Sequence, residues 1–499
     1  MSRPFRLPAL LAAAGVTAAV LLPAPGASAD PRVRPHAVLE RADAIFEGAG
    51  DPAYRMDASM VLRDVFVARP TMDDAERFRA ERLLARPTDR ARDPYGDGYR
   101  APSTRVCKGP VCVHYVPTTR DAPPSHAWVR TTLRVMRRVW DTEVRQLGYR
   151  RPPRDGRHGG DARFDVYLKD LGRQGLFGYC APEYRVRGMK HVASGYCVLD
   201  NDFARSQYGV SPRVSLRVTA AHEFFHAVQF GYDFREDPWL LESTASWMEE
   251  RVADDADDNR RYLRYGQVAR PGTSLDRFDP AGFGQYGNWV FWEYLSQRFG
   301  NRVVRDVWEQ ASARPGSPDR FSVAALRHAL ADRGGLRATF ARYAAALAQP
   351  ARTFPEGAAW PRADIGTGRL GPHRRHARTR VRVNHLASHT IAVRPERGLR
   401  GGWRLHLRVD GPSRAAAPVA TLQVVRRDGS VRTRPVALDR QGEGRVRVRF
   451  DADRVRKVLL TLANASTRYE CRAGGPTYAC RGVPQDQRKA FDVTARIRR

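Results

Sequence analysis

Apolar residues recur with helical spacing in three segments near the start of the chain: 38–46, 58–67 and 72–84. The first turn of the third segment is rich in acidic residues, which favours a helix start there. Glycine and proline then interrupt the pattern up to about residue 105. We therefore expect residues 30–105 to form a helical lead segment. It is either an inhibitory pro-segment or a fixed cap on the domain that follows.

Strand-like and helix-like patterns alternate after residue 105. Strands are expected at 111–116, 164–168 and 195–199. Ser125 is suited to cap a long helix that runs to Leu147, and a second helix is expected at 215–230. This order of elements predicts an α+β fold with a sheet beside the second helix.

The pattern is mainly helical between about 232 and 350. Asp237 is a favourable N-cap and Pro238 fits the first helical position, so a helix is expected to begin there. Four further helices are expected at 286–299, 302–311, 322–331 and 336–348. We assign residues 106–350 to one domain.

Residues 366–499 follow a loop-rich boundary and alternate with period two. The clearest strands are 381–383, 403–407, 420–425, 445–449 and 458–462. Asp428-Gly429 is typical of a hairpin turn. We predict a small antiparallel β-sandwich with arginines on its solvated face.

The first 29 residues have the pattern of a secretory signal peptide. Arg3 and Arg6 precede an apolar run over 7–22, and Ala27-Ser28-Ala29 ends it with small residues. The run is too short to cross a membrane comfortably, and no later stretch is apolar for long enough. We predict cleavage after Ala29, export, and no integral membrane segment.

Six cysteines suit an exported chain, because disulfides persist in oxidising compartments. Six cysteines permit 15 pairings. Pairing between near neighbours is the simplest expectation: Cys107 with Cys112, Cys180 with Cys197, and Cys471 with Cys480.

The formal net charge is +31, and the C-terminal region carries most of it. Residues 366–499 contain 31 basic and 10 acidic residues, a net charge of +21. Such a surface favours an anionic wall polymer, extracellular nucleic acid or an acidic protein as partner. The alternative is a basic surface that serves solubility alone. Nothing in the sequence indicates the oligomeric state.

The predicted helix at 215–230 contains His222-Glu223-Phe224-Phe225-His226. His222 and His226 lie one turn apart on the same helix face. Two imidazoles at that spacing can share one tetrahedral Zn²⁺, with room for a third protein ligand and a water. Glu223 would lie beside the metal, where its carboxylate can take a proton from that water. We predict one zinc ion per chain.

The third ligand distinguishes the classes of zinc peptidase. Metzincins need a glycine and a further histidine where this chain has Gln229 and Tyr232, so that class is excluded. The segment 239–247, Trp-Leu-Leu-Glu-Ser-Thr-Ala-Ser-Trp, resembles the Trp-x-x-Glu-Gly-x-Ala signature of gluzincin peptidases. The resemblance implies that Glu242 is the third zinc ligand. The next candidates are Glu249 and Glu236.

The resemblance continues on both sides of the two motifs. Residues from about 105 to 350 resemble a group of secreted bacterial metallopeptidases with the run His-Glu-Phe-Phe-His-x-x-Gln, found here at 222–229. It implies a zincin-like domain, in which the strand at 195–199 is the edge strand that pairs with an extended peptide substrate. Tyr286 leads a segment similar to a helix whose first tyrosine stabilises the oxyanion. Other tyrosines that could serve instead are Tyr232, Tyr265 and Tyr294.

Two positions depart from the gluzincin pattern. Ser243 replaces the usual glycine after the ligand, and Ser246 stands where some gluzincins keep an aspartate that orients a zinc-bound histidine. Glu249 or an acid from 200–202 is expected to take that role.

These features predict a secreted zinc metallopeptidase that hydrolyses polypeptide substrates, with Glu223 as general base. Two other classes remain open. One is a non-catalytic secreted protein that binds anionic surfaces through its basic C-terminal domain, and the other is a zinc hydrolase that acts on a non-peptide bond.

Overall fold

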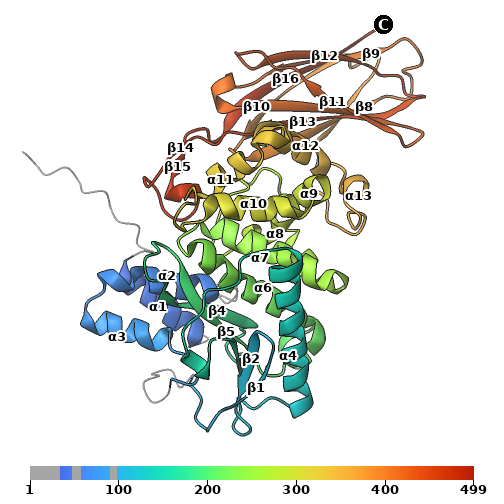
Figure 1. Cartoon of the computed structure of the whole chain (residues 1–499). Coiled ribbons are helices and arrows are strands. Elements are labelled where there is room, and N and C mark those ends of the chain that lie inside the picture. Colours follow the sequence, from blue (N-terminus) through green and yellow to red (C-terminus); the bar gives the residue numbers. More distant parts are fainter. Residues whose placement is uncertain (1–33, 48–57, 90–97) are drawn as a thin grey trace, which may run out of the picture.

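The computed structural model describes residues 34–47, 58–89 and 98–499. The predicted signal peptide, 1–29, lies outside the described residues. The described chain has an α+β part at one end, a β-sandwich at the other, and a group of helices between them (Figure 1).

The sheet of the α+β part has the strand order β1-β2-β3-β5-β4. Its strands are β1 (Thr104–Lys108), β2 (Val111–Tyr115), β3 (Phe164–Lys169), β4 (Gly178–Arg185) and β5 (Ala193–Asp200). The inner strands β2, β3 and β5 run parallel, whereas β1 and β4 are antiparallel to their neighbours. The predicted strands at 111–116 and 164–168 are confirmed.

The prediction that 195–199 forms an edge strand is wrong. Strand β5 lies between β3 and β4, and all eight of its residues are buried. The edge strand is β4, which the sequence pattern did not reveal because Pro182 and Glu183 interrupt its alternation. Proline lacks an N–H donor and is confined largely to sheet edges, which agrees with the place of β4.

Helices cover this sheet. Helix α6 (Pro212–Asp233) packs on β4 and β5, and it also contacts α4 (His126–Trp140) and α7 (Pro238–Ala253). Ser125 caps α4 as predicted, by accepting a hydrogen bond from the Trp128 amide at 3.2 Å. The expected helix to Leu147 ends its α-helical part at Trp140 and continues as one π-helical segment to Gln146.

The three N-terminal helices pack together on the side of the sheet where the edge strand β4 lies (Figure 1). They are α1 (Pro35–Phe46), α2 (Ala58–Ala68) and α3 (Asp74–Leu83), close to the predicted bounds. Asp73 and Glu76 form a reciprocal capping box at the start of α3. Helix α2 contacts β4 directly, and the ring of Phe46 packs edge-on against Tyr179 of the same strand.

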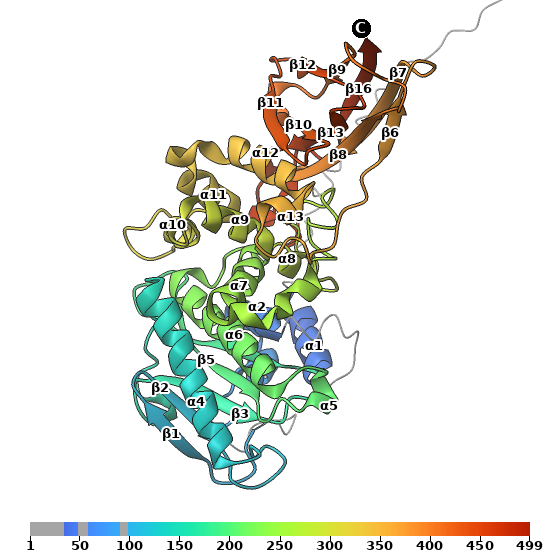
Figure 2. The same cartoon turned by 90° about the vertical axis from the view of Figure 1, so that its right-hand side faces the viewer.

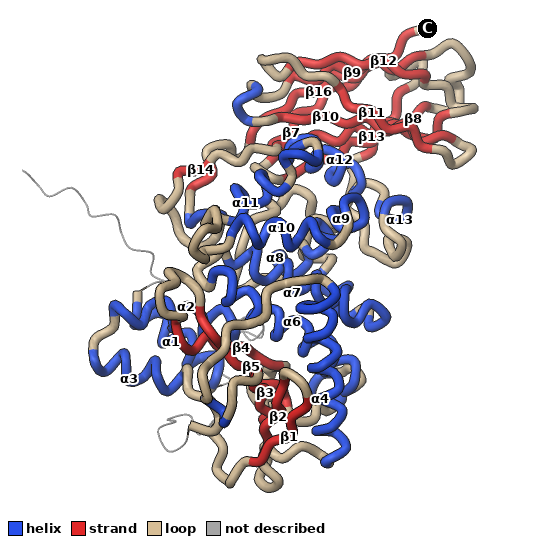
Figure 3. The backbone as a smooth tube through the Cα atoms, in the orientation of Figure 1, coloured by secondary structure: helices blue, strands red, loops and turns tan. Residues whose placement is uncertain are grey.

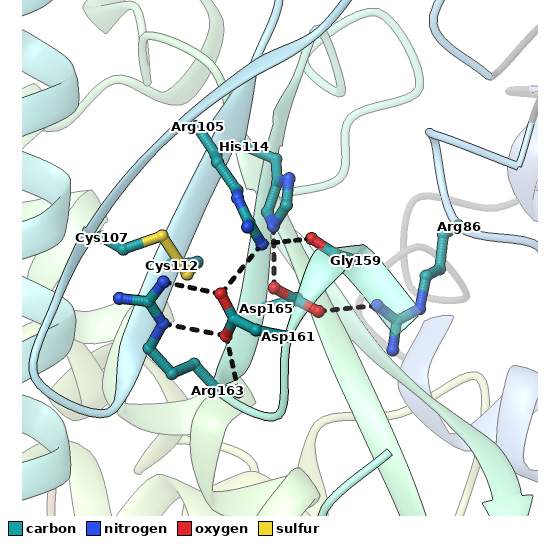
Figure 4. Close-up of a disulfide and its surroundings, with 9 residues drawn as sticks. All are labelled: Arg86, Arg105, Cys107, Cys112, His114, Gly159, Asp161, Arg163 and Asp165. Carbon is teal, nitrogen blue, oxygen red and sulfur yellow. Dashed lines mark hydrogen bonds and ion pairs between the residues drawn. A yellow bond between two sulfur atoms is a disulfide. The ribbon is translucent and has the colours of Figure 1, made fainter. Parts of the chain in front are cut away.

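Arg86, just after α3, fastens this lead segment to the sheet (Figure 4). Its guanidinium lies 2.6 Å from both Asp165 of β3 and Glu183 of β4, and 2.5 Å from Asp155. Only 2% of Arg86 is exposed, and His114 bonds the second oxygen of Asp165 at 2.7 Å. A buried cation among three carboxylates couples the end of the lead segment firmly to the domain.

The middle of the molecule is helical (Figure 3). Its main helices are α8 (Gly284–Gly287), α9 (Trp289–Phe299), α10 (Arg302–Ala311), α11 (Ser322–Ala329), α12 (Gly335–Leu347) and α13 (Pro350–Thr353). The predicted helix 286–299 is broken at Asn288, whose side chain accepts from the Gln267 amide and donates to the Leu275 carbonyl. The adjacent Gly287 has no room for a side chain, because a Cβ would lie 2.4 Å from the Tyr262 carbonyl oxygen.

Residues 367–498 form a sandwich of two sheets (Figure 2). Their strand orders are β11-β10-β13-β8-β6 and β12-β9-β16-β7. The strands are β6 (Thr367–Leu370), β7 (His376–Val383), β8 (Ala387–Pro395), β9 (Arg404–Asp410), β10 (Pro418–Arg426), β11 (Val431–Val436), β12 (Glu443–Arg449), β13 (Val455–Asn464) and β16 (Lys489–Arg498). The predicted strands are confirmed. Gly429, with a φ of 85°, lies in the turn that joins β10 to β11. The four-stranded sheet is wholly antiparallel, but β6 runs parallel to β8 in the other.

The sandwich is joined to the helical part by buried polar contacts. The Asp276 carboxylate lies 2.7 Å from His385 Nε2 and accepts from the Tyr469 hydroxyl at 2.7 Å. Helix α7 begins at Pro238 as expected, but Asp237 does not cap it. Its carboxylate accepts instead from the Ser322 hydroxyl and the Cys480 amide.

All three disulfides follow the expected local pairing: Cys107–Cys112, Cys180–Cys197 and Cys471–Cys480. The first two link residues that lie directly opposite each other on neighbouring strands. The bond at Cys180 ties the edge strand β4 to β5. Within the described ranges, no helix has the length and apolar character needed to cross a membrane.

Candidate metal centre

The structure brings His222, His226 and Glu242 together. The two histidines project from α6 and the glutamate from α7, and the two helices are joined by the short loop 234–237. Glu242 Oε2 lies 3.2 Å from His222 Nε2, and Glu242 Oε1 lies 3.7 Å from His226 Nε2. One donor atom from each of the three residues lies within 4.8 Å of the others. Two imidazole nitrogens and a carboxylate oxygen therefore converge on one point.

The other nitrogen of each imidazole has its own partner. Glu249 Oε1 lies 2.7 Å from His222 Nδ1, and Gln229 Oε1 lies 2.8 Å from His226 Nδ1. The Gln229 amide donates to the Leu241 carbonyl and the Thr244 hydroxyl, which directs its oxygen toward His226. In both histidines Nδ1 therefore has its own partner, and Nε2 faces Glu242. This is the arrangement that orients imidazoles for a metal.

Glu223 lies in the same buried site and contacts the N-terminal helices. The Ser59 hydroxyl of α2 donates to Glu223 Oε2 at 2.7 Å and accepts from the Cys180 amide of β4 at 2.9 Å. One side chain of the lead segment thus bridges Glu223 and the edge strand. His222 and Glu223 are each 8% exposed, and His226 and Glu242 are each 1% exposed. All four side chains are therefore largely shielded from solvent.

Burial and hydrogen bonding move the protonation equilibria of the cluster in different directions. Burial opposes a charged His222, but its hydrogen bonds to Glu242 and Glu249 outweigh that effect and raise its pKa well above the usual range. Burial lowers the pKa of His226 and raises that of Glu249. His226 is thus held in the neutral form that a metal ligand requires.

Tyr286 lies next to the cluster. It is 1% exposed, and its ring stacks on the His222 ring with centroids 6.0 Å apart. Tyr232 lies elsewhere, because its hydroxyl accepts from the Arg150 amide and donates to Glu309. The rings of Tyr265 and Tyr294 pack against Phe283 and Phe354, respectively. Of the four tyrosines considered, Tyr286 is the one whose ring contacts a histidine of the cluster.

The other acidic candidates are engaged elsewhere. Glu236 accepts hydrogen bonds from the amides of Asp237 and Ser322. Asp200 accepts from four backbone amides near the end of β5, and burial raises its pKa to about 6. Glu249, the remaining candidate to orient a histidine, bonds His222.

Two contributors to the site were not expected from the sequence. Gln229 excluded metzincins and closed the His-Glu-Phe-Phe-His-x-x-Gln run, but no role in the site was predicted for it. Its spacing of three residues from His226 on a helix places both on one face. Ser59 gave no signal, since it lies 164 residues from Glu223. Only the fold brings this pair together.

No protein-family model matches the chain, and no curated protein matches it by sequence. The assignment of the site as a metal centre therefore depends on its geometry and on the residues themselves.

Proposed function

We propose that this protein is a secreted zinc metallopeptidase with a zincin-like domain. The observation that carries the proposal is the convergence of His222 Nε2, His226 Nε2 and a Glu242 oxygen, with each Nδ1 held by a separate acceptor. Such outer hydrogen bonds are characteristic of histidines that bind a metal. The three disulfides fit an oxidising destination.

The donor set fits zinc. Two neutral imidazoles and one carboxylate are the ligand set of several catalytic zinc sites, which keep a fourth position for water or substrate. Bound Zn²⁺ supplies a lowered water pKa and a polarised carbonyl group. His222, His226 and Glu242 would hold the ion, whereas Glu249 and Gln229 would keep the two imidazoles in place.

The protein's own groups supply the proton transfers. The Glu223 carboxylate follows His222 directly on α6, so it takes the proton of the attacking water and later delivers it to the leaving amine. The Tyr286 hydroxyl would donate to the oxyanion, a contribution of about 3 kcal/mol for a typical donor. Strand β4 offers the unpaired edge along which an extended peptide can lie.

The Ser59 contacts favour the inhibitory role of the lead segment over that of a passive cap. The Ser59 hydroxyl forms hydrogen bonds with both the proposed general base Glu223 and the Cys180 amide on the sheet edge. A substrate strand would need those same two groups. We propose that α1 and α2 must move away before a peptide can bind, while Arg86 keeps the end of the segment on the sheet.

The first experiment tests metal and catalysis together. The full chain and a Glu223→Ala variant are purified, their zinc is measured by elemental analysis, and both are assayed on casein and a peptide library. One zinc per chain with cleavage lost in the variant is the expected result. Absence of zinc, or equal cleavage by both proteins after α1 and α2 have been released as described below, would refute the peptidase proposal.

A second arm separates inhibition from catalysis. A recognition site for a specific protease is inserted between Pro70 and Thr71, which are both exposed, so that a cut releases α1 and α2 alone. Peptidase activity should rise after the cut. Activity that is equal before and after it would identify the segment as a fixed cap. Zinc binding without cleavage of any peptide, before or after the cut, would favour the non-catalytic class.

A further inference from the structure

The outer face of the sheet β12-β9-β16-β7 lies on the side of the sandwich away from the candidate metal centre (Figures 1 and 2). Along β9 the residues alternate strictly, with Leu405, Leu407 and Val409 buried and Arg404 and Arg408 exposed. The apolar side packs against the other sheet of the sandwich. The polar side carries the arginines predicted for the solvated face.

The register of this sheet places basic residues directly opposite one another. Across β12, β9 and β16, one row is Arg449, Arg404 and Arg498, and the next is Arg447, His406 and Arg496. A third row joins Arg445 and Arg408 and reaches Arg378 of β7 through Thr494. These three rows are called the arginine face below. Like charges that face each other across strands destabilise a sheet, so the arrangement works against the fold.

Acidic groups relieve this repulsion at one end of the arginine face, where Glu443, Asp410 and Asp492 form the next row. Arg408 pairs with Glu443, and Arg449 lies 3.5 Å from Asp451. The other arginines of the face make no ion pair with any residue that the structure describes. Slight burial and the charges of three neighbouring arginines lower the pKa of His406. The local potential is therefore strongly positive.

Two grooves lie along these residues. A groove of about 480 Å³ is lined by residues of all three rows. A second, of about 570 Å³, runs toward β11 and adds Arg426, Arg432 and Arg434. Arg447 lines both grooves, and the second groove also contains Asp428 and Asp453. Strands lie about 4.8 Å apart, and alternate residues on a strand lie about 7 Å apart, so the positive charges form a regular lattice.

We propose that the arginine face binds a linear, flexible phosphodiester polymer that lacks bases. Arginine forks bind phosphate oxygens in pairs, and a flexible chain can follow a lattice of charges across a flat sheet. The large hydrophobic residues exposed in the described part are Phe78, Tyr184 and Val483, and none lies on these strands. The face thus lacks the aromatic platform on which single-stranded nucleic acids stack. This proposal does not depend on catalysis.

The test uses the full chain and synthetic poly(glycerol phosphate) as the probe. Arg447, Arg496 and Arg498 are replaced together by Gln, and a matched control replaces three exposed arginines outside the face: Arg187, Arg205 and Arg213. Both variants lose the same net charge. Affinities are measured over a salt series, in parallel with duplex DNA and with anionic lipid vesicles.

The face variant should bind the polymer at least about tenfold more weakly than the parent, and its log–log salt slope should fall by about 2. The control should stay close to the parent. The face variant should also melt no lower than the parent, because a repulsive row has been removed. Equal losses in both variants, a lower melting temperature, or tighter binding of DNA or vesicles than of the polymer would overturn the proposal.

Discussion

Replacement of Glu249 by Gln tests whether the His222 partner tunes a metal site. The Glu249 carboxylate is buried and lies 2.7 Å from His222 Nδ1. A hydrogen bond to a charged group contributes about 1.5–3 kcal/mol, against about 0.5–1.5 kcal/mol for a neutral one. Gln keeps the shape and an acceptor oxygen but loses the charge, so the difference is about 1.4 kcal/mol, or tenfold in affinity. We expect zinc to bind Glu249→Gln about tenfold more weakly, and Glu249→Ala up to about a hundredfold more weakly.

The affinity is measured by competition with a chromophoric zinc chelator at constant pH, and thermal melts of the metal-free proteins confirm that each variant folds. Glu250→Gln is the matched control, because Glu250 is the next residue on α7 and bonds Asn259 instead of a histidine. Burial raises the pKa of Glu250 to about 8, so at pH 7 its carboxyl is largely protonated and Gln is a close substitute. Unchanged zinc affinity in Glu249→Gln, or an equal loss in Glu250→Gln, would refute the assigned role.

Three further changes test how the parts of the molecule are held together. Arg86→Ala should lower the free energy of unfolding by about 3–5 kcal/mol in a denaturant titration at pH 8. Burial already raises the pKa of Glu183, so protonation of this carboxyl should make the loss smaller at pH 5. Equal losses at the two pH values would contradict this reasoning. Replacement of Cys180 and Cys197 by Ala, 17 residues apart, should cost about 3 kcal/mol in the same assay, and a cost near zero would show that β4 is held by other contacts. Burial would raise the pKa of Asp276, but His385 and the hydrogen bonds that Asp276 accepts lower it. Asp276→Asn should therefore destabilise the fold above pH ~4, and its stability should approach that of the parent as acid protonates Asp276. A loss of stability that is the same at pH 3 and pH 7 would contradict this.

Local sequence patterns predicted the elements that carry the candidate site. His222 and His226 share a helix face because of the helical period alone, and the structure places them side by side with Glu242. The start of α7 at Pro238 and the cap at Ser125 also depend on nearest neighbours, and both were predicted.

Long-range contacts decided what local patterns could not. The order of strands in a sheet depends on packing between distant segments, so the burial of β5 and the edge position of β4 were not predictable from alternation. The same holds for Asp237, which bonds Ser322 and Cys480 instead of its own helix.

The sequence by itself determined the local chemistry of this protein: the spacing of its two histidines, the close spacing of its cysteines along the chain and the surplus of arginine in its last domain. The tertiary structure alone decided which groups lie next to these residues. It set Ser59 against Glu223, gave His222 its partner Glu249, and aligned arginines row by row across one sheet. The reason is physical. A helix or a turn is specified by residues a few positions apart, whereas contacts across the fold arise only when buried surfaces from the whole chain pack together.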